Sequence, residues 1–339
     1  MAAMPTDSLS SSSPPGPTSS RVPPVSRALV VACLVAVYLI WGSTYLAILF
    51  AIGTMPPLLM AGARFLLAGL ILYGIARWRG APKSSFAHWR TALIIGGCLL
   101  LCGNGGVTLA EQYVSSGLAS VMVATVPIYI ALLAWWSGIA PRPTPIVWLG
   151  LAGGLAGVVV LMLPEIHFSS GQTGHAGLGM FILLCSSFLW SAGSIYSRKA
   201  KDLSPPLLLA GQQMICGGVL LTLAGLVMGE HRNFDAQRIS ALSLGSFIYL
   251  VIIGALVGYT AYIFLLRHCE PAKVATYAYV NPIVAVILGA LFAGESLNAR
   301  TALAAGLIIG SVALVITVQQ ARARPVPAPV ACLETANET

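Results

Sequence analysis

The chain has 339 residues, of which 57% are hydrophobic and 8% are charged; its mean hydropathy is +0.87 and its formal net charge is +8. Soluble domains carry roughly 25% charged residues, so this composition excludes a soluble globular protein. It indicates an all-α integral membrane protein, because the apolar runs are too long for barrel strands and do not alternate with polar residues.

The two ends of the chain differ in composition from everything between them. Residues 1–27 are polar and rich in Pro and Ser, so we expect a disordered tail. They carry no signal-peptide pattern, since the first apolar run has full length and lacks a small-residue cleavage site close behind it. Residues 320–339 are expected to form a second short, Pro-rich tail.

Between the tails, the few charged residues separate apolar stretches of about 20 residues, the length that one membrane-spanning helix needs. The stretch from Ala28 to Arg77 is longer, and it is divided in two near Pro56 and Pro57. We therefore predict ten transmembrane helices. In chain order they cover residues 28–49, 57–77, 91–109, 116–136, 145–163, 176–196, 206–228, 241–265, 272–292 and 301–319.

Lys and Arg residues are distributed unequally between the two sides of the predicted membrane. With the N-terminus inside, fourteen of the 18 fall in cytoplasmic segments, whereas Arg232, Arg238 and Arg300 fall on the other side. Positively charged loops prefer the cytoplasm, so both termini are predicted to be cytoplasmic. The net positive charge then reflects topology, and no nucleic-acid partner is expected.

A short phrase occurs twice, as PPLLMAG at 56–62 and as PPLLLAG at 205–211. Trp41 and Trp190 stand at equal distances before the two phrases, so chance similarity between apolar segments is the weaker explanation. Ten predicted helices in two copies give five helices per copy. Because five is an odd number of crossings, the second copy must enter the membrane in the opposite orientation, as in many transporters. We predict two inverted-topology repeats around a central cavity, over 28–163 and 176–319, joined by an external loop over 164–175.

Prolines and glycines mark equivalent places in the two repeats. Pro127 and Pro282 each lie near the middle of a span, where a proline removes one helical hydrogen bond. We predict a paired hinge beside the cavity; a packing kink is the alternative. The small-residue stripes at 150–154 and 306–310 predict close helix packing.

Aromatic and polar residues inside the spans are candidates for the cavity wall. Trp41 lies deeper than an interfacial aromatic belt requires, and Trp190 holds the mirrored depth. Polar side chains within spans usually face the bundle interior or water, although packing or a bond to the backbone is the alternative for each. The residues predicted to line the cavity are Trp41, Ser43, Tyr45, Asn104, Thr108, Trp190, Tyr259, Tyr262, Tyr277 and Asn281.

One cation and one carboxylate near the external side could act together. Arg64 lies two turns inside the external end of its span, and Glu111 lies at the external end of the next span. They predict either a structural ion pair or a gate whose arginine binds carboxylates. The second repeat has Gln213 where Arg64 stands, so any site based on charge is asymmetric.

Motifs for catalysis are missing from the sequence. No G-x-x-x-x-G-K-[ST] motif occurs, no Asp or Glu lies at mid-membrane depth, and Cys98 with Cys102 would make a poor metal site. We therefore predict no catalytic residue, no metal and no cofactor. A membrane-embedded lipid enzyme, the alternative from another class, would need a His/Asp/Glu cluster at one interface.

The chain carries the runs YLIWGSTYLAI, PPLLMAGARFLLAG, LWSAGSIYSRK and YAYVNPIVAVILGALFAGESL. In these runs it resembles the EamA-type branch of the drug/metabolite transporter superfamily, over about residues 28–319. The resemblance implies ten helices in two inverted repeats, and efflux across the bacterial inner membrane by facilitated diffusion or by exchange with protons. Position by position, it places in the central cavity Trp41, Ser43, Asn104, Trp190, Tyr277 and Asn281.

The predicted function is secondary export of small metabolites such as amino acids or amphipathic drugs, with a small solute and the lipid bilayer as partners. An importer, or a carrier of sugars or nucleotide sugars, is the alternative within transport. Relatives that move sugar phosphates use intramembrane lysines and arginines for the anion. Only Arg64 is available here, which disfavours a polyanionic solute.

Overall fold

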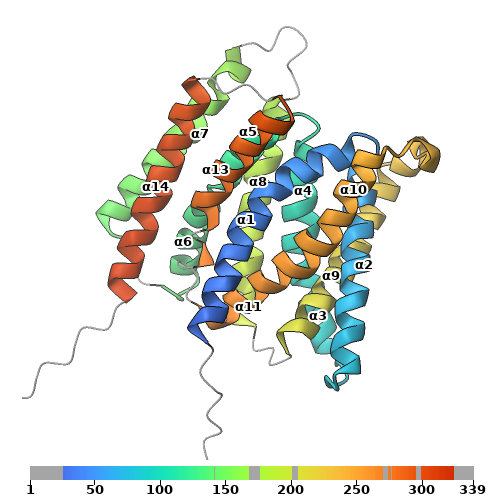
Figure 1. The fold of residues 1–339 in the computed structure, drawn as a ribbon. Helices are drawn as coiled ribbons and strands as arrows, with labels where there is room; N and C mark the ends of the chain where they lie inside the picture. The colour runs from blue at the N-terminus through green and yellow to red at the C-terminus, as the bar shows by residue number, and fades with distance from the viewer. Residues whose placement is uncertain are drawn as a thin grey trace, which may run out of the picture.

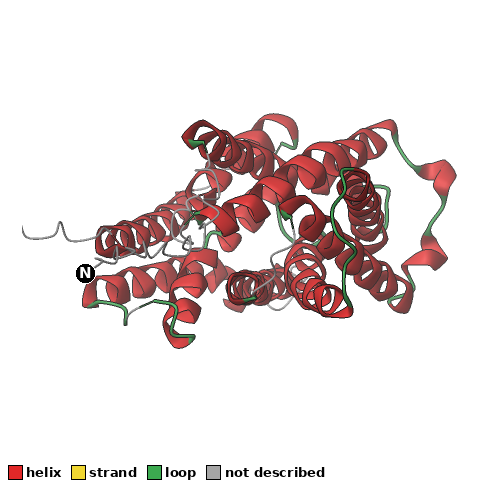
Figure 2. Cartoon of the chain, turned by 90° about the horizontal axis from the view of Figure 1, so that it is seen from below, coloured by secondary structure: helices red, strands yellow, loops and turns green. Residues whose placement is uncertain are grey.

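The computed structural model describes residues 26–140, 142–167, 176–200, 205–269, 274–275, 277–294 and 299–323. All regular secondary structure in these residues is helical, as predicted, and the helices form one bundle (Figure 1). Seen from below, many of them are viewed nearly end-on (Figure 2). The two predicted tails and the predicted loop over 164–175 lie largely outside the described residues.

Seven helical segments of the described chain are long and apolar enough to cross a membrane. The predicted all-α integral membrane class is therefore confirmed, whereas ten crossings stay a prediction. The seven are α1 (Arg27–Ile52), α2 (Pro57–Trp78), the α3–η1–α4 rod (Phe86–Ala110), the α5–α6 segment (Ser116–Trp136), α8 (Ala176–Lys199), α9 (Pro206–Val227) and the α10–η4–α11 rod (Ala241–His268). Shorter apolar stretches occur in α7 (Pro145–His167), α13 (Tyr277–Phe292) and α14 (Ala299–Ala323), and the 3₁₀ turns η2 (Glu230–Asn233) and η3 (Ala236–Arg238) precede α10.

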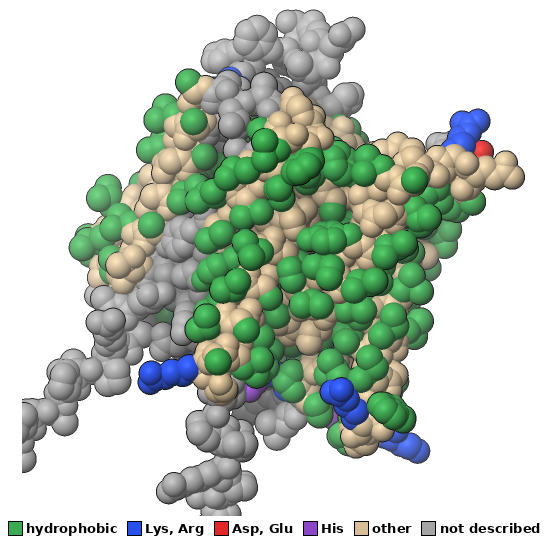
Figure 3. Space-filling view, viewed as in Figure 1, with side chains coloured by type: hydrophobic (Ala, Val, Ile, Leu, Met, Phe, Trp, Pro, Cys, Tyr) green, Lys and Arg blue, Asp and Glu red, His purple; other side chains and the backbone are tan. Residues whose placement is uncertain are grey.

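The exterior of the bundle is apolar. In Figure 3, hydrophobic side chains cover the visible flank, with Lys and Arg at its lower edge and at one projecting corner. Leu39, Leu70 and Leu149 are each more than half exposed. A surface of this size and composition is suited to lipid rather than to water.

The two copies of the repeated phrase begin α2 and α9, and these two helices pack against each other. A proline stands at the start of each, where its missing N–H has no helical partner to lose. A Cβ atom added at Gly69 would lie 2.9 Å from the Gly211 carbonyl oxygen, and one at Gly62 would lie 3.1 Å from that of Gly218. The glycines therefore allow backbone-to-backbone contact, and the order of the pairs makes α2 and α9 antiparallel.

The last helices of the two predicted repeats, α7 and α14, also lie side by side (Figure 1). The close contact there uses Gly157, whose added Cβ would lie 2.7 Å from the Ile308 side chain, and Gly153 against Ser311. Gly306 and Gly310 have open space around them among the described residues. The close packing predicted for the 306–310 stripe is therefore not found among the described residues, because the adjacent face of α14 turns toward α7. In the 150–154 stripe, by contrast, Gly154 lies close to the side chains of Ile128 and Ser311.

Two rods contain a π-helical segment at their centre. In the α3–η1–α4 rod (α3 Phe86–Gly96, α4 Gly106–Ala110) this segment is η1, Gly97–Gly105. In the α10–η4–α11 rod (α10 Ala241–Tyr249, α11 Thr260–His268) it is η4, Leu250–Tyr259. Wide turns of this kind are rare and often lie at functional sites, and here both face the interior cavity described below.

The two mid-span prolines stand in different local structures. The segment that holds Pro127 is broken, since α5 (Ser116–Val123) ends three residues before α6 (Val126–Trp136) begins, and Pro127 lies in the first turn of α6. Pro282 instead lies inside the continuous helix α13. The proposed hinge pair is thus a break on one side and an intact helix on the other.

Candidate functional site: an interior cavity

A cavity lies inside the bundle, with walls from α1, α2, η1, α4, α5, α6, α8, η4 and α13. Water molecules can place their centres in about 70 Å³ of it, whereas roughly 10–15 Å³ is enough for one. It therefore has room for several waters or one small solute. Its lining residues are Trp41, Thr44, Tyr45, Ile48, Arg64, Phe65, Gly103, Asn104, Val107, Val123, Val126, Ser186, Ser187, Trp190, Gly254, Ala255, Tyr259 and Tyr277.

Four aromatic rings meet at one end of the cavity, toward the N-terminal half of α1. We call Trp41, Trp190, Tyr262 and Tyr277 the aromatic cluster. The Trp41 ring centroid lies 5.4 Å from that of Trp190, 4.8 Å from Tyr262 and 5.2 Å from Tyr277. Trp190 Nε1 donates to the Tyr262 hydroxyl at 3.2 Å, and Ser194 Oγ lies 2.8 Å from the same hydroxyl. These contacts fix the orientations of the rings.

Each tryptophan of this cluster packs against a glycine of a π-helical segment. A Cβ atom added at Gly103 would lie 2.7 Å from Trp190 Cε3, and one at Gly258 would lie 2.8 Å from Trp41 Nε1. Only glycine leaves room for a ring at that distance from the backbone. Gly103 and Gly258 are separated by the same number of residues as Pro127 is from Pro282, so they are equivalent positions of the two copies.

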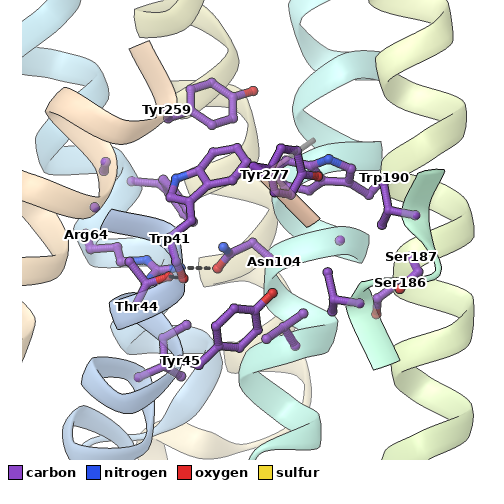
Figure 4. Close-up of a pocket in the computed structure, with 18 residues that line it drawn as sticks. Trp41, Thr44, Tyr45, Arg64, Asn104, Ser186, Ser187, Trp190, Tyr259 and Tyr277 are labelled. Carbon is purple, nitrogen blue, oxygen red and sulfur yellow. Dashed lines mark hydrogen bonds between the residues drawn. The ribbon is translucent and has the colours of Figure 1, made fainter. Parts of the chain in front are cut away.

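Polar groups gather beside the aromatic cluster. The Arg64 guanidinium donates from Nη2 to Asn104 Oδ1 and lies over the Phe65 ring, with its central carbon 4.4 Å from the ring centroid (Figure 4). Arg64 is only 3% exposed, and its Nε has no hydrogen-bond partner among the described residues. Its charge also interacts with that of Glu111, which is 3% exposed.

A neutral pair occupies the equivalent place on the other side. The Tyr259 hydroxyl donates to Gln213 Oε1 at 2.8 Å, and both residues are buried. Gln213 is the counterpart of Arg64 in the repeated phrase, and Tyr259 is the counterpart of Asn104 at the Gly103-to-Gly258 spacing. A side chain of α2 is thus bound to η1 as a side chain of α9 is bound to η4, but only the first bridge carries a charge.

Comparison with known families agrees with this duplicated architecture. The model of the EamA-like transporter family matches residues 28–163 and, a second time, residues 177–317. The chain belongs to this family. The resemblance seen in the sequence is therefore confirmed, and the chain is a drug/metabolite transporter of the EamA type.

Relatives of this EamA-like transporter are named as transporters. The Escherichia coli K12 protein "Uncharacterized inner membrane transporter YedA" is 39% identical over 300 residues, which cover 88% of this chain and 94% of that protein. "Uncharacterized transporter YvbV" of Bacillus subtilis is 26% identical over 304 residues, or 89% and 95% of the two chains. These names favour a transporter over an enzyme and give no solute.

A solved crystal structure, described only as that of a protein, matches with a TM-score of 0.62 at 19% identity. The match covers 88% of this chain and all of the other. At this identity the likeness shows the fold alone.

Six of the ten residues predicted to line the cavity do lie in its wall: Trp41, Tyr45, Asn104, Trp190, Tyr259 and Tyr277. Arg64, predicted as a gate or ion-pair residue, lies in the wall as well. Tyr262 does not line the cavity itself but packs behind the lining rings of Trp41 and Trp190. The other three are engaged elsewhere. Ser43 Oγ donates to the Ile40 carbonyl at 2.8 Å, and Thr108 Oγ1 donates to the Asn104 carbonyl at 3.0 Å.

Asn281 lies against the backbone of α1. In the amide orientation that satisfies both of its polar atoms, its side-chain NH₂ donates at 3.1 Å to the carbonyl oxygens of Tyr38 and Tyr277. The side chain therefore ties α13 to α1 instead of reaching the cavity. That these lining residues bind a solute stays a prediction.

Sequence reasoning missed two hydroxyl residues of the wall, Ser186 and Ser187, and left a third, Thr44, out of the predicted lining although it stands next to Ser43. Thr44 lies one helical turn after Trp41, and its Oγ1 donates to the Trp41 carbonyl at 2.8 Å. Ser186 and Ser187 form an adjacent polar pair within an apolar span, which is a visible signal.

Proposed function

We propose that this transporter works by alternating access between two inverted-topology repeats of five transmembrane helices each. In this proposal both termini are cytoplasmic, and the protein exports small metabolites, such as amino acids or amphipathic drugs, across the inner membrane. The cavity is the transport site.

The pair of Trp–Gly contacts carries the proposal. A two-fold axis in the membrane plane would exchange Trp41 with Trp190 and Gly103 with Gly258. Each ring packs against the glycine of the other repeat, and the two rings touch each other between the repeats. Movement of one repeat against the other must therefore change both contacts together, as alternating access requires.

The α2–α9 contact supports the same symmetry. Gly62 and Gly211 are equivalent in the repeated phrase, and so are Gly69 and Gly218. Gly62 faces Gly218 whereas Gly69 faces Gly211, so exchanging the copies reproduces the same contacts. Antiparallel packing of equivalent helices is what inverted copies predict.

The opposed orientation of the repeats can be tested with single cysteines in a background without the native ones. Ala140 and Gly294 follow the fourth and ninth predicted spans. We expect a membrane-impermeant maleimide to label Gly294→Cys from outside and Ala140→Cys only after permeabilisation. Labelling of both from the same side would contradict the inverted repeat.

Transport itself can be tested by counterflow in proteoliposomes. With a panel of amino acids and amphipathic drugs, we expect saturable exchange for at least one solute, and none in liposomes without protein. Flat traces for every solute would contradict the proposed export.

A further inference from the structure

We propose that the transported solute is held through a single carboxylate, which binds the Arg64 guanidinium while the solute's apolar body lies against the aromatic cluster. The inference rests on the proposed function, because it takes the cavity to be the transport site. It adds the chemical group that the site recognises and the residue that recognises it.

The guanidinium of Arg64 has donors to spare. It carries five N–H groups, no acceptor, and a permanent charge. One of these groups serves Asn104, while the buried Nε has no partner among the described residues. A buried donor without an acceptor is unfavourable, and a carboxylate is the acceptor that fits a guanidinium edge best.

The surroundings of Arg64 offer a second donor and an apolar wall. Because Asn104 accepts from Arg64 through Oδ1, its NH₂ group is directed away from that bond and toward the cavity (Figure 4). In the same view Arg64, Asn104 and Thr44 lie together on one side of the row of rings. A carboxylate between Arg64 and Asn104 would place its attached carbon chain beside the ring of Trp41.

The charges of the cavity specify one anionic group rather than two. Among the described lining residues, Arg64 alone carries a permanent charge and none is acidic. The equivalent place in the second half holds the neutral Gln213–Tyr259 pair. Arg64 already interacts electrostatically with Glu111. A second negative group on the solute would therefore find no further cation among the described lining residues.

Binding to the purified full-length protein in detergent tests the inference. The probes are the straight-chain carboxylates from propanoate to hexanoate, 4-methylpentanoate, and the amide of each, titrated by calorimetry. Members of a pair share the apolar body and differ in charge. We expect at least one carboxylate to bind about tenfold or more tightly than its amide, the factor that one hydrogen bond to a charged group supplies. If no carboxylate binds more tightly than its amide, the proposal is wrong.

Variants assign the preference to Arg64. Arg64→Gln, which introduces the residue found in the second half, should reduce the carboxylate-to-amide affinity ratio to about one. The double variant Arg64→Gln/Glu111→Gln keeps the buried pair neutral, so it provides the same measurement if the single variant does not fold. The control Arg79→Gln removes an exposed guanidinium at the other end of the same helix, and it should keep the full ratio. A ratio that persists in the double variant would overturn the proposal.

The outcomes separate this inference from the proposed function. Counterflow of neutral solutes without any preference for carboxylates would leave the transporter and remove the anion site. Selective carboxylate binding, with no counterflow of any solute, would leave the anion site and remove transport.

Discussion

The two halves of the bundle share their scaffold and differ in their chemistry. Trp41 on Gly258 and Trp190 on Gly103 are one contact made twice. The bridges beside them are not the same, because Arg64 binds Asn104 in the first half whereas Tyr259 binds Gln213 in the second. In the proposed mechanism, the symmetric packing would let the halves exchange shapes, and the asymmetric charge would give a solute one preferred orientation.

The two halves also differ in the helix structure around their mid-span prolines. The first half has a gap in its fourth span just before Pro127, and the second half keeps Pro282 inside α13. Asn281 binds α13 to the backbone of α1 beside Pro282, whereas the residue before Pro127 is Val126, which lacks a polar side chain. Similar packing in the two halves is therefore compatible with different local structure around the two prolines.

The charged half should be the more sensitive to a single polar change. Arg64→Gln removes the cation that interacts with the buried Glu111, which we expect to lower the free energy of unfolding by about 3–5 kcal/mol. Gln213→Leu, the matched change in the neutral half, should cost about 1–2 kcal/mol because Tyr259 loses its acceptor. Thermal unfolding in detergent measures both.

The double change Arg64→Gln/Glu111→Gln should recover much of the loss, because no buried charge is left uncompensated. If the single Arg64 variant is no less stable than Gln213→Leu, or the second substitution restores nothing, the charge does not distinguish the halves as described.

The scaffold should respond equally in both halves. An added Cβ would lie 2.8 Å from Ile215 N at Gly69 and 2.8 Å from Tyr73 N at Gly211. Since backbone atoms cannot move aside as a flexible side chain can, Gly69→Ala and Gly211→Ala should each lower stability by about 1–3 kcal/mol. The control is Gly306→Ala, which meets open space among the described residues and should be neutral or stabilising. Clearly unequal losses would break the symmetry of this contact.

Much of this scaffold could be predicted from the sequence. Helix-length apolar runs gave the helices, and the repeated PPLL-AG phrase indicated which helices correspond. The π-helical segments η1 and η4 could not be predicted, because a change from four-residue to five-residue hydrogen-bond spacing leaves no sign in an apolar, Gly-containing run. Those segments decide which side chains of their rods reach the cavity.

The hydrogen-bond partners of the polar side chains were harder to predict than the places of these side chains in the helices. The sequence predicts that Arg64 acts with Glu111 because both lie near the external side, and the structure adds Asn104, which was predicted to line the cavity without a named partner. Ser43 and Thr108 face backbone carbonyls one turn back in their own helices. A hydroxyl in an apolar span can satisfy itself in this way, so its presence alone does not indicate a cavity.

The two tryptophans should matter equally for transport. Trp41→Ala and Trp190→Ala each remove one ring from the wall and from the contact with the other repeat. Each should lower the counterflow rate about tenfold or more, which corresponds to a rise of roughly 1.4 kcal/mol in the activation free energy. The control Trp136→Ala changes a ring that is 85% exposed on α6 and should keep the rate. A rate that only one cavity variant changes would show that the rings serve different steps.

The smallest effect is expected for the neutral bridge. Tyr259→Phe keeps the ring and removes the hydroxyl that donates to Gln213, so it should cost about 1 kcal/mol of stability. It should leave the carboxylate-to-amide affinity ratio unchanged, because this bridge holds no charge. Asn104→Leu, the matched change in the charged bridge, should lower that ratio by removing the amide that orients Arg64. Calorimetric titration of both variants with the same probes makes the comparison. An equal fall in the ratio for both would mean that the cavity recognises its solute through both halves alike, and that the single charge of Arg64 is not what orients it.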